Sequence, residues 1–444
     1  MKLNTKKITG NLILGLIILL PFNFAYISNF AAVQNLLFFS EPLKYSFFLF
    51  DALFLILLIF WLKEKLTTRK LLFSRDWFLI TIYLIFSSLL IASNPKIAFY
   101  NASRILEVIL FFCIFIDTIK TKNLFNKALY LIFLSGVIQS LIALLQFIFQ
   151  KSLGLKYLGE SLLSPSILGV AKIEVAREKF IRGYGTFPHP NLLGAFLFLA
   201  LLAGFYFILN RNLQIPFSLP EKIKILRLKK PTKNLLAKIH FFTGSLIIST
   251  GIITTFSRSV WLVTALLILG IIIFRFKPLF SKKYLFKQTL LTIVILMAFW
   301  AGFARFVPAR ICTGNCQDQS LTLRQNYSEF AKTVIAKNLI FGIGPGQFIT
   351  TFKEQNPTNL PDWDIQPVHN LYLMILSELG FVGFLLLFGF IFKNISPGKN
   401  LFSILVGSFL ILGFFDHYFW TLPQGQFIFW LSLALLASSG RIDK

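Results

Sequence analysis

Charged residues are scarce in this chain. Only 14% of its 444 residues are Asp, Glu, Lys or Arg, whereas a soluble domain usually contains about 25%. Hydrophobic residues make up 56% of the chain, and its mean hydropathy is +0.73. This composition excludes a soluble globular protein and indicates an integral membrane protein. The length suits one large membrane domain rather than a series of soluble domains.

Acidic residues are much rarer than basic ones: 18 Asp and Glu stand against 44 Lys and Arg, which gives a net charge of +26. Such an excess is also typical of nucleic-acid-binding proteins, but the basic residues here form no single face. Most of them fall in short segments between apolar runs, as in the cytoplasmic loops of membrane proteins. We therefore expect membrane lipid, anionic at the inner face, as a partner, and no nucleic acid.

Only three cysteines are present. Cys312 and Cys316, in "CTGNC", belong to a segment that the topology below places outside the cytoplasm, where an oxidising environment permits a disulfide. The sequence does not decide whether they are joined. No second cluster of Cys or His accompanies the pair, which argues against a metal site there. Cys113 lies inside an apolar run, where we expect it to pack as a small hydrophobic residue.

Long apolar runs are what the chain has in abundance. A helix needs about 20 mostly apolar residues to cross the hydrocarbon core of a bilayer. The first run, after "MKLNTKK", ends without a small-residue cleavage site, so we predict a transmembrane helix there and not a removable signal peptide. Helices satisfy their own backbone hydrogen bonds in lipid, so the predicted fold class is an all-α integral membrane protein. We predict about 12 transmembrane helices, at residues 10–30, 45–62, 76–93, 97–118, 125–149, 190–209, 240–257, 259–276, 288–307, 368–392, 401–416 and 425–439.

The distribution of basic residues predicts the orientation of these helices. With both termini in the cytoplasm (N-in/C-in), most Lys and Arg fall in inside segments, and the two longest loops fall outside. The predicted segments are transmembrane helices 1–5 in 1–149, an extracytoplasmic loop in 150–189, helices 6–9 in 190–307 with a basic cytoplasmic loop at 210–239, a large extracytoplasmic loop in 308–367, and helices 10–12 in 368–444.

Four polar stretches fall on the predicted outer side, where ordered loops often carry function. The first is "RGYGTFPHPNLLGAFL", residues 182–197. A loop that ends at the start of a helix explains its prolines, its glycines and Asn191, and His189 is expected to be structural. Arg182 is not explained in this way. A guanidinium group can bind a planar anion through two hydrogen bonds.

The second stretch is "TTFSRSVWL", residues 254–262, with Arg258 at the turn between two apolar runs. The arginine either extends toward lipid headgroups or holds an anion such as phosphate. In the second case Ser257 and Ser259 could add hydroxyl donors.

The third stretch is "LTLRQNYSEFAKTVIAKNLIFGIGPGQF", residues 321–348. Its apolar residues recur near helical spacing, which predicts an amphipathic helix on the outer surface. Arg324 is either a solvated helix charge or a third contact to an anion. "GIGPGQF" lacks the spacing and the Lys-Ser/Thr of a nucleotide phosphate loop, so we expect a turn.

The fourth stretch is "QPVHNLYLMILSELG", residues 366–380, with His369 at the start of the tenth predicted helix. A neutral imidazole can accept a proton from a hydroxyl; a histidine solvated at the interface is the alternative. Glu378 lies roughly 13 Å deeper along the helix, so we expect a buried structural charge with its own partner. Arg104 is a candidate partner, although Glu107 can also claim that arginine.

In order, spacing and common side, these stretches resemble the O-antigen ligase and O-antigen polymerase superfamily. Its members are polytopic bacterial enzymes that act on undecaprenyl-diphosphate-linked glycans at the outer face of the cytoplasmic (inner) membrane. The resemblance covers a core from about residue 180 to 392. It rests on "RGYGTFPHPNLLGAFL", "FSRS", the amphipathic helix before "GIGPGQF", and "HNLYLMILSELGFVGF". It implies a fold similar to the GT-C-type membrane glycosyltransferases.

The resemblance also implies the site residues. Arg182 and Arg258, with Arg324 as a third contact, match arginines that bind the lipid diphosphate of the donor, and His369 matches the histidine that acts on the acceptor hydroxyl. The implied partners are an undecaprenyl-diphosphate-linked glycan donor and a glycan, lipid or protein acceptor. The implied reaction is an inverting transfer that uses no metal, nucleotide or other cofactor.

Three functions stay open at this point. A ligase transfers a finished glycan to a different acceptor, such as a lipid-anchored oligosaccharide (lipopolysaccharide is one case) or a protein, whereas a polysaccharide polymerase adds glycan to another lipid-linked repeat unit. A transporter or flippase for the lipid-linked oligosaccharide is the alternative from a different class. Transporters usually show matching halves and polar residues near the midplane, and we find neither pattern here. We therefore expect ligase-like glycosyltransferase chemistry.

Overall fold

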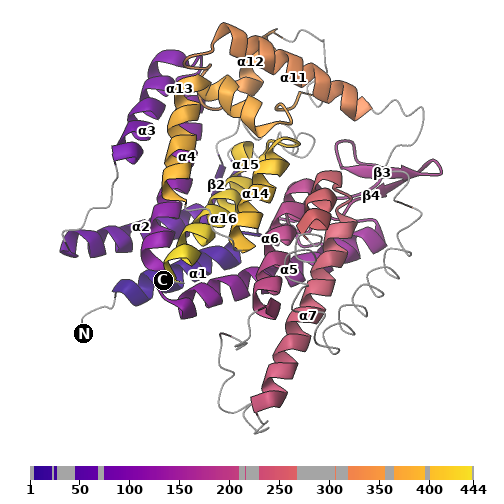
Figure 1. The fold of residues 1–444 in the computed structure, drawn as a ribbon. Coiled ribbons are helices and arrows are strands. Elements are labelled where there is room, and N and C mark those ends of the chain that lie inside the picture. The colour runs from indigo at the N-terminus through magenta and orange to yellow at the C-terminus, as the bar shows by residue number, and fades with distance from the viewer. Residues whose placement is uncertain are drawn as a thin grey trace. The chain divides into compact units, whose positions relative to one another are not determined.

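The computed structural model describes residues 5–22, 25–27, 46–68, 75–209, 216, 230–267, 306, 319–355, 365–395 and 401–442. These residues are mostly helical, and the strands among them form two short antiparallel pairs (Figure 1). The predicted helical class is confirmed. The chain forms two compact units. The first comprises Met1–Phe125 and Asp318–Lys444, and the second comprises Asn126–Gln317.

The first unit combines helices from both ends of the chain. Its N-terminal part contains α1 (Thr5–Leu19), β1 (Ala25–Ile27), β2 (Ser46–Phe48), α2 (Leu49–Thr68), α3 (Arg75–Phe86), the π-helical turn η3 (Ser87–Ile91), α4 (Pro95–Thr118) and the first turn of α5 (Lys122–Phe149). Its C-terminal part contains α11 (Gln319–Lys337), α12 (Phe348–Gln355), α13 (Leu371–Asn394), α14 (Leu401–Gly413), α15 (Tyr418–Thr421) and α16 (Pro423–Ile442). Helix α16 packs against α4, and α11 packs against α13, so the two parts of the sequence share one core.

The second unit contains the rest of α5, the 3-10 turn η4 (Lys156–Leu158), β3 (Lys172–Val175), β4 (Glu178–Ile181), α6 (Pro190–Leu209), α7 (Lys230–Thr254) and a shorter helix, Arg258–Leu267. Helix α6 is apolar on all sides and buried along most of its length, as expected of a central helix. It packs along α7, where the rings of Phe207 and Phe241 stack with centroids 4.4 Å apart. A Cβ on Gly136 would lie 2.3 Å from the Cβ of Ala200, so α5 and α6 are in direct contact there.

Five described helices are long and apolar enough to cross a membrane: Pro95–Thr118, Lys122–Phe149, Pro190–Leu209, Leu236–Thr254 and Leu371–Asn394. Each coincides with a predicted span. Shorter apolar helices lie where three more were predicted, at Asp76–Ile91, Arg258–Leu267 and Leu401–Gly413. The predicted span 288–307 lies outside the described residues apart from Phe306, and so do Cys312 and Cys316. The protein is therefore a multi-pass membrane protein, while the number 12 and the orientation stay predictions.

Helix α11 lies where the sequence predicts an amphipathic helix. It buries Tyr327, Phe330 and Val334, which are three or four positions apart and so share one face. The predicted turn at "GIGPGQF" is also confirmed, because no helix lies between the end of α11 at Lys337 and the start of α12 at Phe348.

Helix α13 is interrupted, which the sequence did not predict. At Gly380 the backbone has φ 59° and ψ −171°, a conformation that favours glycine. The preceding loop, residues 339–344, supplies partners for the interrupted backbone. Four hydrogen bonds join them: Phe381 N to Leu339 O (2.8 Å), Val382 N to Ile340 O (3.1 Å), Ile343 N to Ser377 O (3.0 Å) and Gly344 N to Glu378 O (2.9 Å). The loop and the two halves of the helix therefore form one hydrogen-bonded structure.

Two glycines allow this close approach. A Cβ on Gly380 would lie 2.4 Å from the backbone nitrogen of Gly342, and a Cβ on Gly342 would lie 2.4 Å from the carbonyl oxygen of Glu378. The hydroxyl of Tyr83 on α3 donates to the same region, 3.0 Å from the carbonyl of Phe341 and within hydrogen-bond distance of the carbonyl of Leu379. The interruption is thus enclosed by α3 as well as by the loop.

Glu378 does not pair with Arg104, its candidate partner from the sequence. Arg104 Nη1 lies 2.7 Å from Asp51 Oδ1 and 2.8 Å from Glu107 Oε2, so two carboxylates already occupy it. Glu378 instead accepts a hydrogen bond from Trp420 Nε1 at 2.8 Å. Its side chain is buried, which agrees with the expectation of a structural charge.

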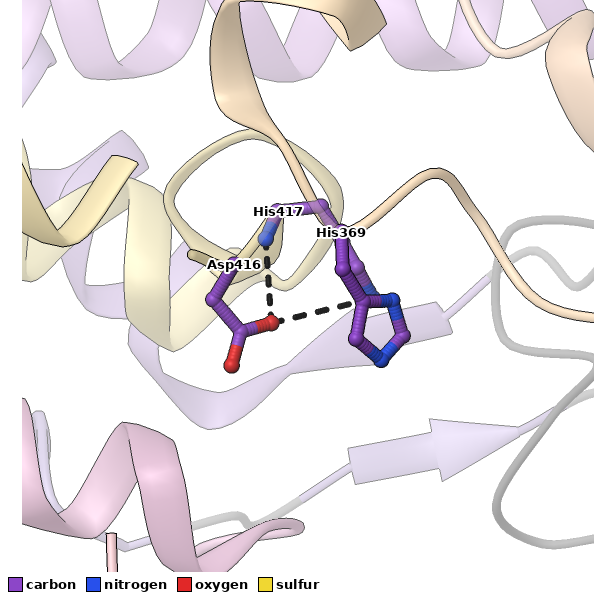
Figure 2. A group of neighbouring side chains, drawn as sticks. All are labelled: His369, Asp416 and His417. Atoms are coloured by element: carbon purple, nitrogen blue, oxygen red, sulfur yellow. Dashed lines mark hydrogen bonds and ion pairs between the residues drawn. The ribbon is translucent and has the colours of Figure 1, made fainter. Parts of the chain in front are cut away.

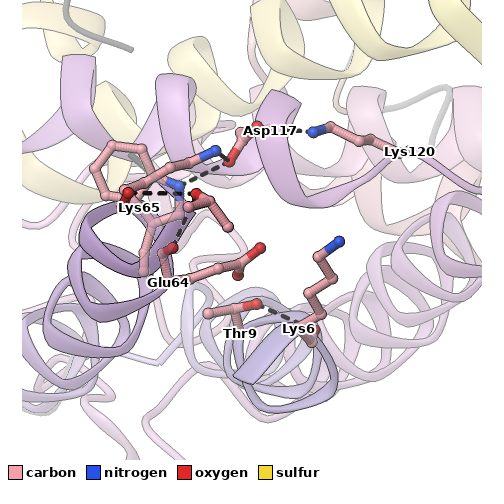
Figure 3. A network of polar contacts seen from close by, with 8 residues as sticks. Lys6, Thr9, Glu64, Lys65, Asp117 and Lys120 are labelled. Atoms are coloured by element: carbon pink, nitrogen blue, oxygen red, sulfur yellow. Dashed lines mark hydrogen bonds and ion pairs between the residues drawn. The ribbon is translucent and has the colours of Figure 1, made fainter. Parts of the chain in front are cut away.

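A second polar network joins the C-terminal ends of α2 and α4 (Figure 3). Asp117 accepts a hydrogen bond from Trp61 Nε1 at 2.9 Å and forms ion pairs with Lys120 at 2.8 Å and with Lys65. Both lysines belong to segments that the sequence predicts to be cytoplasmic. One carboxylate therefore connects the inner ends of two predicted spans.

Candidate functional site

His369 lies in the last residues of the loop before α13. Asn370 caps that helix, because its side-chain oxygen accepts hydrogen bonds from the backbone nitrogens of Tyr372 and Leu373, both at 3.0 Å. The ring nitrogen Nδ1 of His369 lies 3.1 Å from the carbonyl oxygen of Pro367. Because a carbonyl only accepts, Nδ1 carries the hydrogen and Nε2 keeps its lone pair. The residue thus has the tautomer that a general base needs.

Asp416 and His417 lie beside His369, in the turn between α14 and α15 (Figure 2). The ring centroids of the two histidines are 4.9 Å apart. His417 Nε2 is 3.9 Å from Asp416 Oδ1, and the same oxygen accepts the backbone N–H of His417 at 3.0 Å. On the other side of its ring, His417 Nδ1 lies 2.6 Å from Thr421 Oγ1. A loop and a turn far apart in sequence therefore bring two imidazoles and a carboxylate together.

Helix α11 contributes to the surroundings of this histidine cluster (His369, Asp416 and His417). The ring of Tyr327 stacks near that of His369, with centroids 6.2 Å apart. Arg324, one turn earlier on the helix, is close enough for its charge to act on both imidazoles. The structure thus brings Arg324 and His369 into one neighbourhood of the first unit.

Both imidazoles are poor proton acceptors when compared with a histidine in water. Burial lowers the pKa of His369; the Asp416 carboxylate opposes this shift, and the Arg324 guanidinium adds to it. Burial and the neighbouring His369 lower the pKa of His417 to about 3. Near pH 7 both rings are therefore neutral.

A small cavity with a mixed apolar and polar lining adjoins the cluster at Thr421. Its lining includes Thr421, the hydrogen-bond partner of His417, and the buried carboxylate of Glu378. Asn101 and Gln426 add side-chain amides to the same cavity. Thr421 therefore links the cluster to this cavity.

Arg182 and Arg258 belong to the second unit, where they lie near the same turn. Arg182 is 4% exposed. Its Nε donates to the carbonyl of Thr255 at 2.5 Å, and its Nη2 donates to Asn191 Oδ1 at 2.6 Å. The start of α6 and the turn after α7 are thus joined by one guanidinium group. This gives Arg182 the structural explanation that the sequence alone did not supply.

Arg258 is the first residue of the helix Arg258–Leu267 and is partly exposed. The preceding Ser257 is buried, and its hydroxyl lies 3.4 Å from that of Ser259. A cation, two hydroxyls and the positive end of a helix dipole are therefore grouped at this turn, an arrangement that favours an anion.

Two glutamines of α5 position the loop that follows Arg182. Gln146 Oε1 accepts hydrogen bonds from the backbone nitrogens of Tyr184 and Gly185, at 3.0 and 2.8 Å. Gln139 Oε1 accepts from the nitrogen of Thr186 at 2.9 Å. Both glutamines are buried. The sequence analysis missed them, although two amides seven positions apart in an apolar span are a signal of buried polar contacts.

His189 has a local role, as expected. Its Nδ1 accepts the backbone N–H of Asn191 at 3.2 Å, at the start of α6. Asp416 and His417 are the site residues that the sequence analysis missed. A signal was present, because the chain has only four histidines and "DH" stands alone in the apolar segment "FFDHYFW".

A family model matches part of the chain. Residues 243–388 match the family described as O-antigen ligase. This stretch includes Arg258, Arg324 and His369, whereas Arg182 and the Asp416–His417 pair lie outside it. A search of curated proteins gave no match.

Proposed function

We propose that this chain, which belongs to the O-antigen ligase/polymerase superfamily through its matched domain, is a ligase-like membrane glycosyltransferase. It transfers a glycan from an undecaprenyl-diphosphate donor to a hydroxyl group of an acceptor. The reaction takes place at the outer face of the cytoplasmic membrane, is independent of metal ions, and inverts the anomeric centre. Family membership supports a lipid-linked glycan as substrate in general, and the arrangement of the site supports the chemistry.

The tautomer of His369 is the observation that carries the proposal. The hydrogen bond from Nδ1 to Pro367 leaves Nε2 as the basic atom. Nε2 takes the proton of the acceptor hydroxyl while the oxygen of that hydroxyl bonds to the anomeric carbon of the donor glycan. The bond from that carbon to the diphosphate oxygen breaks, and the lipid diphosphate leaves with the electron pair. General-base catalysis of this kind contributes about 10²–10⁴-fold to the rate.

The arginines carry the electrostatic part of the proposal. Negative charge develops on the diphosphate as the anomeric bond breaks, and preset guanidinium groups stabilise it in the position that a metal ion would otherwise occupy. Arg258 is the foremost candidate, because it is partly exposed at a helix N-terminus. Arg324 is the candidate in the first unit, near His369. Arg182 holds the turn before Arg258 in place while contributing its own positive charge.

Asp416 supports the proposed role of His369 as general base. When His369 takes up a proton it becomes a cation beside Arg324, which is unfavourable in a buried setting. The Asp416 carboxylate is 6% exposed and opposes this effect. It therefore stabilises the imidazolium that forms during transfer.

The test is an assay with purified protein, an undecaprenyl-diphosphate-linked glycan and a panel of acceptors. Transfer to a lipid-anchored oligosaccharide or a protein identifies a ligase, and growth of a lipid-linked repeat unit identifies a polymerase. A chelator should leave the rate unchanged. Strict dependence on an added divalent ion would overturn the metal-independent mechanism, and donor movement across vesicles without transfer would identify a transporter.

A further inference from the structure

Three side chains that commonly bind metal ions meet in the histidine cluster. One donor atom from each of His369, Asp416 and His417 lies within 4.8 Å of the other two (Figure 2). The carboxylate is buried. The group therefore differs from the exposed acidic clusters that are common on protein surfaces without a ligand.

Both imidazoles are held by an oxygen on the side that faces away from a shared ion. His369 Nδ1 donates to the carbonyl of Pro367 at 3.1 Å, and His417 Nδ1 lies 2.6 Å from the hydroxyl of Thr421. In each ring Nε2 is the nitrogen that remains for a metal. Histidines that bind metals are usually oriented in this way, by a hydrogen bond from the second ring nitrogen to a carbonyl or another oxygen.

We propose that His369, Asp416 and His417 form a site for a divalent transition metal ion of the zinc class, and that an ion bound there inhibits glycan transfer. Two imidazoles and one carboxylate, with a fourth position open to water, suit zinc. The ion takes the lone pair of His369 Nε2, so that atom can no longer accept a proton from the acceptor. The inhibition rests on the proposed function, whereas the binding does not.

The spacing of the donors is close to what zinc requires. Zinc bonds of about 2 Å draw ligand atoms to somewhat less than 4 Å from one another. His417 Nε2 and Asp416 Oδ1 are now 3.9 Å apart. All three donor atoms lie within 4.8 Å of one another, so an approach of about 1 Å between them forms the site.

Zinc affinity at this site should depend on two neighbouring charges, those of Arg324 and Asp416. The Arg324 guanidinium acts on both imidazoles and repels a second cation, whereas the Asp416 carboxylate attracts one. Replacement of the arginine by glutamine should therefore tighten zinc binding. Replacement of Asp416 by asparagine should weaken it.

The experiment is calorimetric titration of zinc into the metal-free, full-length protein in detergent, with no polyhistidine tag and no glycan substrate. The wild type should bind one zinc ion per chain. His417→Asn and Asp416→Asn should each bind at least about tenfold more weakly, and Thr421→Val, which removes the oxygen that orients His417, about tenfold more weakly. Arg324→Gln should bind more tightly than the wild type.

His240→Asn is the matched control. His240 lies on α7 of the second unit, with Nε2 3.3 Å from the hydroxyl of Tyr130, so this variant should keep the wild-type affinity. Absence of zinc binding by the wild type overturns the site. Equal affinity in the wild type, His417→Asn and Asp416→Asn also overturns it. The tightening expected from Arg324→Gln keeps the proposal testable even where loss of a ligand prevents folding.

The inhibitory part has a separate readout. Zinc added to the transfer assay should lower the wild-type rate, and His417→Asn should need at least about tenfold more zinc for the same fractional loss. Transfer that is unaffected when the site is filled overturns inhibition alone. A chain that binds zinc as expected but transfers no glycan overturns the proposed function and leaves the metal site intact.

Discussion

At the scale of the residue, two arginines of one unit have different surroundings. Arg182 is buried, with Nε and Nη2 donating to Thr255 and Asn191. Arg258 is partly exposed at the first residue of a helix. A lysine keeps the charge but not the planar set of donors. The same substitution should therefore have different effects at the two positions.

Arg182→Lys should destabilise the protein, because one ammonium group cannot reproduce hydrogen bonds to two separate segments. Loss of a buried, charge-assisted hydrogen bond costs about 1.5–3 kcal/mol. Arg258→Lys should fold normally but bind the lipid-diphosphate donor more weakly. Thermal unfolding and donor titration of both variants separate the two effects. Full recovery of donor affinity with lysine at position 258 would contradict two-donor recognition of the diphosphate.

His369→Ala should lower the transfer rate by about 10²–10⁴-fold, which is the usual contribution of a general base. The variant should still insert into the membrane and unfold at a temperature close to that of the wild type. Rates measured at saturating donor and acceptor test this. His240→Ala is the control: it removes a histidine of the second unit, whose Nε2 lies 3.3 Å from the hydroxyl of Tyr130. This variant should keep the wild-type activity. Equal rates for the wild type and His369→Ala would exclude the base assignment.

The sequence predicted that His369 lies at a helix start, and the structure places it two residues before α13, but the sequence did not reveal the neighbours of that residue. Asp416 and His417 come from a turn almost fifty positions later, and only the packing of α13 and α15 brings them close. The partner of Glu378 was hidden for the same reason. Trp420 lies on α15, directly after that turn, while Asp51, which forms an ion pair with Arg104, lies on α2. Periodicity identifies the buried face of a helix but not the element that covers it.

At the scale of the element, the interruption of α13 is the main departure from the predicted fold. The apolar run 368–392 predicts one continuous helix, and α13 covers most of that range, from Leu371 to Asn394. The break at Gly380 exists because residues 339–344 donate and accept hydrogen bonds there. A glycine in an apolar run is compatible with both arrangements. The long, apolar spans were therefore predictable, whereas a break stabilised by a distant loop was not.

Gly380→Ala should destabilise the protein by at least about 1–3 kcal/mol, because alanine is strained at this positive φ. Its Cβ would also lie 2.4 Å from a backbone atom. Gly389→Ala in the same helix is the control, since nothing lies within 4 Å of the added Cβ. It should be neutral or stabilising by about 0.5–1 kcal/mol. Thermal unfolding in detergent compares the two, and equal midpoints would contradict the role given to the break.

At the scale of the whole molecule, orientation rests on the unequal distribution of lysine and arginine. The lysines joined to Asp117 lie in two of the segments predicted to be cytoplasmic, "KEKLTTRK" and "KTKNLFNK". His369 follows the large loop predicted to be outside, and His417 lies beside it. The charge pattern therefore predicts that the two polar groups lie on opposite faces of the membrane.

Thiol labelling tests this orientation. After mild reduction of intact cells, a membrane-impermeant maleimide should modify Cys312 and Cys316, which are predicted to be outside. A cysteine introduced as Lys120→Cys, at an exposed position of an inner segment, should react only after the membrane is permeabilised. The double variant Cys312→Ser, Cys316→Ser is the background control. The reverse pattern of labelling would invert the topology.

The paired backbone of α13 and residues 339–344 also restricts how this protein can be recombined with its relatives. A chimera that exchanges residues 339–344 but keeps its own α13 would lose the hydrogen bonds around Gly380 wherever the new loop departs from the backbone path of these residues. Unpaired peptide groups at membrane depth cost several kcal/mol each. The unit of exchange therefore runs from the start of α11 past Val382, so acceptor preference, if encoded in that loop, is inherited together with half of a transmembrane helix.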